Sequence, residues 1–347
     1  MTDGPLLRTF DQSMPNLDGA NILVTGGTGT FGKSFAEMVS QRFSPQRLII
    51  FSRDEFKQSE MQAAYPIERF PFMRFFVGDV RDRDRLEMAM RDVDIVVHAA
   101  ALKQVPTAEY NPFECINTNV LGAENVVRAA LGARVKKVIA LSTDKATNPI
   151  NLYGASKLAS DKIFVAANNL SGDDGTVFSV VRYGNVVGSR GSVVPLYRKL
   201  VGAGATSIPV TDPRMTRFWI TVNQGVNFVL SSLETMTGGE IFVPKIPSMK
   251  IEDLAEAIAP GVPVEMVGIR PGEKLHEIMI TDDDARHTWE LDDRYIIAPS
   301  FQFWSNEPFT PKGGRQVGDG FAYASDTNDE WLDAASFASL LQTLEKK

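Results

Sequence analysis

The residue types best suited to proton transfer lie in one stretch, 141–157, which reads LSTDKATNPINLYGASK. Tyr153 and Lys157 are four positions apart, so on a helix both side chains would project from the same face. A tyrosine has an ordinary pKa near 10, and nearby positive charge stabilises the phenolate and lowers that pKa. Tyr153 beside Lys157 is therefore a candidate general base, with an ordinary surface pair as the alternative.

An acid and a base also stand side by side at Asp144 and Lys145, directly after Thr143. A protonated carboxyl group can give up a proton, and a neutral amine can take one. Lys145 would act as a base only with a lowered pKa, which burial and the charge of Lys157 could supply. From adjacency alone the pair is no more than a candidate for acid–base chemistry, with a salt-bridged loop pair as the alternative.

A glycine-rich turn, TGGTGTFG, occupies positions 25–32. Between a first strand and a first helix, glycines at this spacing let a diphosphate approach the backbone N–H groups at the helix start. A dinucleotide cofactor is therefore expected here. In this turn the residues expected to contact the cofactor are Gly26, Thr28, Gly29, Thr30, Phe31 and Gly32.

The next apolar run ends at Ser52 and Arg53, with Lys57 about one helical turn later. An NAD site usually has a carboxylate at such a strand tip, where it binds the ribose 2′-OH. A hydroxyl beside a guanidinium instead suits a 2′-phosphate, so we predict NADP, although Asp54 argues for NAD. Asp79 ends the third run, where it either accepts from the adenine amino group or is a simple turn aspartate. The predicted cofactor set is completed by Val80, Ala99, Ala100, Lys103, Tyr153 and Lys157.

These residues lie at the ends of short apolar runs that alternate with amphipathic stretches. Buried strands separated by helices indicate an α/β fold, a Rossmann doubly wound parallel sheet whose ligands lie at the carboxyl ends of the strands. The predicted strands are 21–26, 47–52, 74–79, 94–100, 136–142 and 178–183. The clearest predicted helices are 31–42, 83–91, 112–131 and 153–170.

After about residue 186 the pattern is less regular, with short strands at 207–210, 240–244 and 264–269. Helices are predicted at 221–234, 250–259 and 329–344. We expect a flexible arm at 1–18, an NADP-binding Rossmann domain with the catalytic Tyr and Lys at 19–186, and a smaller mixed α/β domain at 187–347. The last of these is expected to bind mainly substrate, with some chain crossing between the two.

The composition excludes several classes of function. The 347 residues carry a net charge of −7, which disfavours binding to nucleic acid or an anionic membrane through bulk charge. A single cysteine, Cys115, cannot form an internal disulfide and suits a reducing cytoplasm. No run approaches the roughly 20 apolar residues of a membrane helix. No metal is expected, because the three histidines lack ligand spacing, His98 reads as a packing residue, and 282–284 reads as a solvated acidic loop.

The order of motifs resembles the extended short-chain dehydrogenase/reductase superfamily. Besides the stretches above, these motifs are HAAALKQVP, VRYGNVVGSRGSVVP, TDPRMTRFW and RPGEKLHE, and the similarity covers about 19–335. Within the superfamily the chain resembles the inverting UDP-N-acetylglucosamine 4,6-dehydratases of pseudaminic acid biosynthesis. Related dehydratases of deoxythymidine-diphosphate glucose carry Asp-Glu instead of Asp-Lys, and the membrane-bound retaining relatives replace the tyrosine with methionine. The resemblance implies UDP-N-acetylglucosamine as substrate and a homo-oligomer, a dimer or hexamer.

The resemblance also implies roles for individual residues. Tyr153 would take the proton of the sugar 4-OH, which Thr143 holds; Lys145 would remove the C5 proton; Asp144 would protonate the departing 6-OH. Asn119 would support the catalytic Tyr and Lys. Substrate-binding roles are implied for Lys103, Asn185, Val187, Arg190, Arg217, Arg270 and Glu273.

Three alternatives remain open on sequence alone. Two are enzymes, a retaining 4,6-dehydratase or a 4-epimerase of a UDP-sugar. The third is a non-catalytic NADP-sensing regulator on the same fold, which would tolerate loss of Tyr153 and Lys145. The presence of the whole Thr-Asp-Lys and Tyr-Lys set argues against the regulator.

Overall fold

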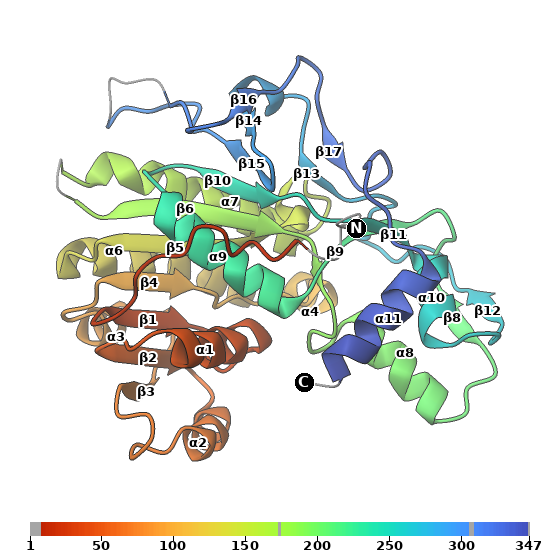
Figure 1. Ribbon diagram of the computed structural model, residues 1–347, viewed down its shortest axis with the longest axis horizontal. Coiled ribbons are helices and arrows are strands. Elements are labelled where there is room, and N and C mark those ends of the chain that lie inside the picture. Colours follow the sequence, from red (N-terminus) through yellow and green to blue (C-terminus); the bar gives the residue numbers. More distant parts are fainter. Residues whose placement is uncertain (1–7, 173–174, 305–308, 346–347) are drawn as a thin grey trace.

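The computed structural model describes residues 8–172, 175–304 and 309–345, and it is built on one large sheet (Figure 1). Its strand order is β16-β14-β15-β10-β6-β5-β4-β1-β2-β3. The pairs from β3 to β10 are parallel, and β15, β14 and β16 are added antiparallel at one edge. The strands are β1 (Asn21–Thr25), β2 (Arg47–Ser52), β3 (Met73–Val77), β4 (Ile95–His98), β5 (Lys137–Thr143), β6 (Val177–Tyr183), β10 (Ile241–Pro244), β14 (Thr288–Glu290), β15 (Arg294–Ile297) and β16 (Arg315–Gln316).

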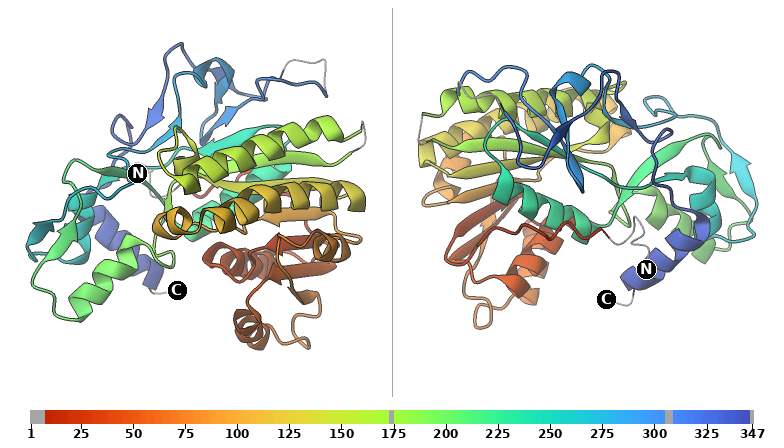
Figure 2. Two further views of the ribbon diagram at one scale, coloured as in Figure 1. Left: turned by 180° about the vertical axis from the view of Figure 1, so that it is seen from behind. Right: turned by 45° about the horizontal axis from the view of Figure 1, so that its top comes forward.

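Helices cover both faces of this sheet, as the views from the front and from behind show (Figures 1 and 2). One face carries α1 (Thr30–Arg42) and α9 (Val222–Thr235), which contact each other. The other face carries α3 (Arg83–Ala89), α6 (Gly122–Ala133) and α7 (Leu152–Ala167). Because the central strands are covered twice, they are runs of Val, Ile and Leu without polar alternation. The predicted doubly wound α/β fold is confirmed.

The helix predicted at 112–131 is divided into three parts. α5 (Pro112–Ile116) leads into a π-helical turn, Asn117–Leu121, and then into α6. Such turns occur mainly as single insertions in α-helices, frequently at functional sites. The irregular turn contains Asn119.

A smaller lobe lies beside the carboxyl ends of the parallel strands (Figure 1). It contains α8 (Val193–Gly202), α10 (Ile251–Ile258), α11 (Ala334–Glu345) and the parallel pair β8 (Ile208–Val210) and β12 (Val264–Met266). It has its own apolar core, in which Tyr197, Leu254 and Phe337 are buried. Small sheets connect the two bodies: β7 (Asn185–Val186), β9 (Thr216–Ile220) and β11 (Ser248–Lys250) form one, and β13 (Ile278–Ile280) and β17 (Tyr323–Ala324) form another.

The chain after residue 186 does not stay within the smaller lobe. The predicted strand at 240–244 is β10, which pairs in parallel with β6 in the main sheet, and α9 packs on α1. This segment lies in the main sheet because its residues are apolar: Phe242 and Val243 are fully buried, like the residues of the other central strands. The predicted crossing of the chain is therefore extensive.

The start of the described chain is not a flexible arm. Residues 1–7 lie outside the described residues, but residues 8–18 run along α9, where Phe10 is 2% exposed and its ring meets the Phe228 ring edge-on at 5.1 Å. Arg8 donates two hydrogen bonds, of 2.8 and 3.0 Å, to the Glu330 carboxylate near the other end of the chain. The expectation of a flexible arm is wrong for residues 8–18, because Phe10 of this segment packs against Phe228, which is far away in the sequence.

Two further findings concern the described residues only. No helix among them combines the length and the apolar character needed to cross a bilayer. Within the same ranges, no three or more His, Cys, Asp or Glu side chains form a group that could hold a metal ion.

Candidate active site at the carboxyl ends of the strands

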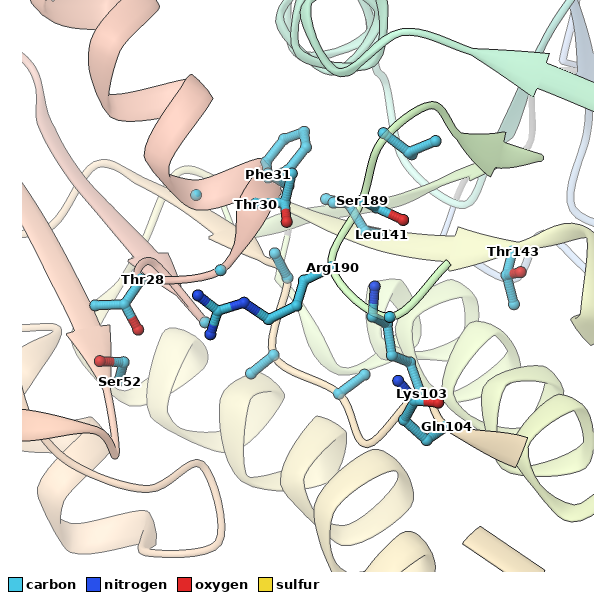
Figure 3. A pocket seen from close by; sticks show the side chains of 18 of the residues that line it. Thr28, Thr30, Phe31, Ser52, Lys103, Gln104, Leu141, Thr143, Ser189 and Arg190 are labelled. Carbon is cyan, nitrogen blue, oxygen red and sulfur yellow. The ribbon is translucent and has the colours of Figure 1, made fainter. Parts of the chain in front are cut away.

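A cavity of about 690 Å³ opens where the parallel strands end (Figure 3). Thr28 and Ser52 lie at one end of it, and Thr143 and Lys103 lie at the other. Every residue predicted to contact the cofactor lines this cavity. The cavity is therefore long enough to join the glycine turn to the acid–base stretch.

The glycine turn leaves backbone donors facing the cavity. Gly26 has a φ of +64°, and a Cβ there would lie 2.9 Å from the Ala100 backbone. A Cβ on Gly32 would lie 2.4 Å from the Gly27 carbonyl oxygen. Helix α1 begins at Thr30, and its N-cap Gly29 supplies no side chain to bind the first N–H groups. Unpaired N–H groups at a helix start suit a phosphate, so this turn fits a dinucleotide.

At the β2 end of the cavity, the charges differ from the expectation. The Lys57 ammonium is paired with Asp54, whose carboxylate also caps α2 (Glu55–Ala64). Arg53 is 59% exposed and lies 3.7 Å from Asp79. Lys57 was expected to add a second positive charge, but its neutralisation by Asp54 leaves Arg53 as the cation better placed for a 2′-phosphate.

Asp79 is likewise occupied. Its carboxylate accepts from the Arg81 guanidinium at 2.7 and 3.0 Å, besides lying near Arg53. A hydrogen bond from an adenine amino group would have to share these oxygens.

The acid–base residues meet where β5 ends. Thr143 is the last residue of β5, and Asp144–Ala146 form a single 3₁₀ turn. Asp144 Oδ1 accepts from Thr143 Oγ1 at 2.8 Å and from Lys145 Nζ at 3.1 Å. Asp144 is 0% exposed, and its Oδ2 has no hydrogen-bond partner among the described residues. An unpartnered buried carboxyl oxygen is costly unless it is protonated or meets a ligand.

Tyr153 and Lys157 both line the cavity from α7. Burial raises the pKa of Tyr153 to about 12, although the Lys145 charge and the Thr143 hydroxyl favour the phenolate. Burial lowers the pKa of Lys157, and Asp161 partly opposes this shift. The cation that assists Tyr153 in this structure is thus Lys145, whereas the sequence had suggested Lys157.

The pKa of Lys145 also differs from the prediction, which was that it would be lowered. Burial lowers its pKa, but the Asp144 and Glu277 carboxylates outweigh burial, so the pKa of Lys145 is raised above its ordinary value. Its Nζ lies 3.1 Å from Asp144 and 3.2 Å from Glu277. The expected lowering is wrong for the site as it stands, because two carboxylates rather than Lys157 surround the ammonium.

Asn119 contacts α7 directly and reaches the backbone of Tyr153 through one intermediate. Its amide nitrogen donates to Ser156 Oγ at 2.9 Å, and Ser156 in turn donates to the Tyr153 carbonyl oxygen at 2.8 Å. The same amide exchanges hydrogen bonds with the Leu102 backbone, next to Lys103. Asn119 thus links the two segments that border the cavity.

The expected substrate residues are divided between two places. Lys103, Asn185 and Arg190 line the cavity, and Asn185 Oδ1 accepts from Lys145 Nζ at 3.4 Å. The Arg190 guanidinium points toward the end where Thr28 and Ser52 lie (Figure 3). The remaining four do not line the cavity: Val187, Arg217, Arg270 and Glu273.

These four residues lie in the smaller lobe or in the segments next to it. Val187 is buried in the core of the smaller lobe. Arg217 is buried and donates to the carbonyl oxygens of Lys274 and Leu275. Arg270 and Glu273 lie 3.7 Å apart on the segment that follows β12.

Sequence reasoning missed the segment that holds the 144–146 turn and its candidate acid and base. Asn151 Nδ2 donates to the Gly272 carbonyl oxygen at 2.8 Å, and Lys274 Nζ donates to the Thr147 carbonyl oxygen. Glu277 lies on the same segment. The RPGEKLHE motif marked this region, but nothing local in it indicates that Glu277 would meet Lys145.

A doubly wound sheet, a glycine turn after β1 and a Tyr-x-x-x-Lys pair on the helix after β5 define the class of extended short-chain dehydrogenases/reductases. The chain belongs to the polysaccharide biosynthesis protein family, which matches residues 22–299.

Relatives of known name agree with this family. A UDP-N-acetylglucosamine 4,6-dehydratase (inverting) from Campylobacter jejuni is 56% identical over 94% of this chain and 98% of its own. A UDP-glucose 4-epimerase from Rickettsia bellii is 44% identical over 80% of this chain and 82% of its own. Among solved structures, Pen from Bacillus thuringiensis has a TM-score of 0.87 and 35% identity, covering 95% of this chain and 99% of that chain. The resemblance to inverting 4,6-dehydratases is thus confirmed.

Proposed function

We propose that the protein is a UDP-N-acetylglucosamine 4,6-dehydratase that inverts C5. The observation that carries the proposal is the hydrogen-bonded group of Thr143, Asp144 and Lys145, in which Asp144 is buried, beside Tyr153 on the cavity wall. It supplies two bases and one acid around a single site, which a 4,6-dehydration requires and a simple reductase does not. The name of the 56% identical relative supports the same activity.

The cofactor in this proposal is NADP. The glycine turn would hold its diphosphate, and Ser52 with Arg53 would hold the 2′-phosphate. The chemistry that a bound nicotinamide would supply is the reversible uptake of the hydride that moves from the sugar C4 to C6. The identity of the bound dinucleotide follows from mass spectrometry of the small molecule released by denaturing the purified protein.

Tyr153 begins the chemistry by taking the proton of the sugar 4-OH, which Thr143 Oγ1 holds. The high pKa of Tyr153 means that the phenol is protonated in the ligand-free site at neutral pH. The phenol of Tyr153 lies on the wall of the cavity that would hold the cofactor, and the positive charge of an oxidised cofactor there would lower the pKa of the phenol. Tyr153 thus becomes a base when the cofactor is present.

Lys145 and Asp144 then carry out the elimination. The 4-ketone acidifies the C5 proton, which Lys145 removes, and Asp144 donates its proton to the departing 6-OH so that water leaves. Protonation of C5 on the opposite face gives UDP-2-acetamido-2,6-dideoxy-β-L-arabino-hexos-4-ulose. An Asp144 that is protonated at its unpartnered Oδ2 is suited to this donation.

Substrate binding in the proposal involves both bodies. Lys103, Asn185 and Arg190 would contact the sugar and diphosphate from the cavity wall, whereas Arg217, Arg270 and Glu273 would act on the nucleotide end. We further propose a cytoplasmic homo-oligomer in a pathway to pseudaminic acid.

A 4-epimerase is the second candidate, because a 44% identical relative carries that name. Epimerisation needs only C4 oxidation and reduction, so it leaves Asp144 and Lys145 without a role. A retaining dehydratase would use both residues but return the proton to the original face of C5.

The deciding experiment incubates the purified protein with UDP-N-acetylglucosamine in D₂O and follows the product by mass spectrometry and NMR. We expect loss of one water, deuterium at C5 and couplings of the L-arabino configuration. A D-xylo product would refute inversion, and a C4 epimer without loss of water would refute the dehydratase.

A further inference from the structure

Glu277 occupies a position that the reaction scheme does not yet use. It precedes β13 and is 2% exposed. Its Oε1 lies 3.2 Å from Lys145 Nζ and 3.7 Å from Arg217 Nε. Its Oε2 is buried and has no hydrogen-bond partner among the described residues. Glu277 therefore faces the candidate C5 base with one oxygen occupied and one open.

The backbone around Glu277 is held on both sides. Its N–H donates to Ser325 Oγ at 2.9 Å, and the Ser325 N–H donates to the Glu277 carbonyl oxygen at 2.8 Å. Ser325 also bonds to Thr216, which precedes Arg217 on β9. The carboxylate is thus fixed relative to Lys145.

Several charged groups surround this pair. Asp144 lies on the other side of Lys145, Arg217 approaches from β9, and Lys274 approaches from the segment before β13. The His276 ring is hydrogen-bonded through Nδ1 to Thr216 Oγ1 at 2.8 Å. From α7, Tyr153 interacts electrostatically with Lys145. Lys145 is therefore an ammonium between the Asp144 and Glu277 carboxyl groups, and it is a base only after it loses a proton.

Only one of the two carboxylates is free to take that proton. Asp144 must already be protonated to release water from C6, so it cannot also accept the proton of Lys145. Glu277 touches Lys145 directly, and its Oε2 is open to carry a proton. The Glu277 side chain is 3% exposed, so neutralising the ion pair by proton transfer also removes the cost of keeping that carboxylate charge away from water.

We propose that Glu277 is a positioning residue that takes the surplus proton of Lys145, so that Lys145 meets the sugar as a neutral amine. This inference rests on the proposed dehydratase function. The Lys145 N–H bond breaks and an O–H bond forms on Glu277, and the net charge of the pair is zero before and after. The neutral amine then takes the C5 proton and becomes an ammonium again. Glu277 releases its proton to water when the product leaves, and Asp144, which lost a proton to the departing hydroxyl, takes one up, so that the starting charges are restored.

The test uses Glu277→Gln, which keeps a hydrogen-bond acceptor but cannot take up the proton. Glu290→Gln is the matched control, because Glu290 pairs with Lys245 at 3.0 Å outside the cavity. Glu277→Asp keeps a carboxylate and tests whether the fold tolerates a change at this position. Circular dichroism confirms folding of all three variants.

The first readout needs no substrate. Competitive acylation of lysines across pH, read by mass spectrometry, reports the titration of Lys145. We expect Glu277→Gln to lower the pKa of Lys145 by about one to three units, the usual effect of one opposite charge at this distance, and the control to leave it unchanged. An unchanged titration in Glu277→Gln would overturn the inference, whether or not the wild type is a dehydratase.

The second readout separates the steps of turnover. Single-turnover absorbance follows C4 oxidation, and deuterium uptake follows proton removal at C5. In Glu277→Gln at pH 7 we expect C4 oxidation to persist while C5 exchange falls by about tenfold or more. Exchange should then rise about tenfold per pH unit as Lys145 loses its proton to solvent, whereas Glu277→Asp stays flat like the wild type.

Either of two outcomes contradicts this expectation. Equal losses in C4 oxidation and C5 exchange would reduce Glu277 to a structural residue, and wild-type exchange in Glu277→Gln would remove its role altogether. A wild type that never releases water would refute the dehydratase proposal itself, while the acylation contrast would still decide whether Glu277 controls the charge of Lys145.

Discussion

At the residue scale, burial shifts the pKa values of the groups near the strand ends, and the charges of neighbouring residues then oppose or add to that shift. Tyr153 keeps a raised pKa because its neighbours only partly offset burial, whereas Lys145 is pushed the other way by two carboxylates. His98, at the end of β4, has no such compensation. It is buried, its Nδ1 meets Thr25 Oγ1 at 2.8 Å, and burial followed by the Lys157 charge lowers the pKa of His98 to about 3.

The buried His98 should make the protein sensitive to mild acid. Its folded-state pKa is lowered, so below the ordinary pKa of about 6.5 only the unfolded chain takes up the proton. The stabilising contribution is complete above that value and falls as the pH drops toward 3. Between pH 7 and 5 the free energy of unfolding should fall by about 2 kcal/mol more in the wild type than in His98→Asn.

Urea denaturation at a series of pH values measures this difference. His287→Asn, at a half-buried histidine in the second half of the chain, is the control and should follow the wild type. Parallel curves for the wild type and His98→Asn would contradict the prediction.

At the element scale, the start of α7 is packed against the turn that carries the acid and the base. A Cβ on Gly154 would lie 2.2 Å from the Lys145 carbonyl oxygen, closer than any real contact. Asn151 caps the helix through the Gly154 N–H at 2.8 Å. The short approach between the helix and the turn therefore depends on a missing side chain.

Gly154→Ala should displace the 144–146 turn and reduce turnover by about 100-fold or more, because small misplacements of reacting groups are that costly. Gly132→Ala is the matched control within α6, where a Cβ would meet nothing within 4 Å. That control should be neutral or stabilising by about 0.4–1 kcal/mol. Product formation and urea denaturation measure the two effects, and equal behaviour of the two variants would refute the packing argument.

At the scale of the whole molecule, both ends of the described chain help to join the two bodies. Residues 8–18 lie on α9 of the main sheet, and Arg8 binds Glu330, which precedes α11 of the smaller lobe. The candidate catalytic turn is held in the same manner, since Asn151 and Thr147 bond to the segment between β12 and β13. The active-site cavity thus depends on contacts between segments that are distant in the sequence.

Removing the Phe10 ring should weaken this arrangement. Phe10→Ala should lower the free energy of unfolding by about 3 kcal/mol, the usual cost of deleting a buried aromatic ring. Phe301→Ala is the control, because Phe301 is 72% exposed. Thermal and urea denaturation compare the two variants, and a Phe10→Ala variant as stable as its control would mean that residues 8–18 do not contribute to the fold.

The parts that could be predicted from sequence are those with a local signature. The strands of the parallel sheet, the glycine turn and the Tyr153–Lys157 spacing each depend on neighbours within a few positions, and each was found near the predicted place. The prediction failed where a distant contact decides the outcome. Residues 8–18 read as polar and irregular until α9 covers Phe10, and 240–244 read as an isolated strand until β6 pairs with it.

The sequence by itself therefore determined the class of fold, the glycine turn and the positions of the candidate acid and bases, because periodicity and spacing encode the fold and the turn locally and the candidates follow from the motifs that carry the resemblance. Only the tertiary structure decided the charge state of those groups. Lys145 is held as an ammonium by Asp144 and Glu277, and Lys57 is neutralised by Asp54. Proton affinity depends on the charges within a few ångströms and on distance from water, and neither quantity can be computed from positions along a chain.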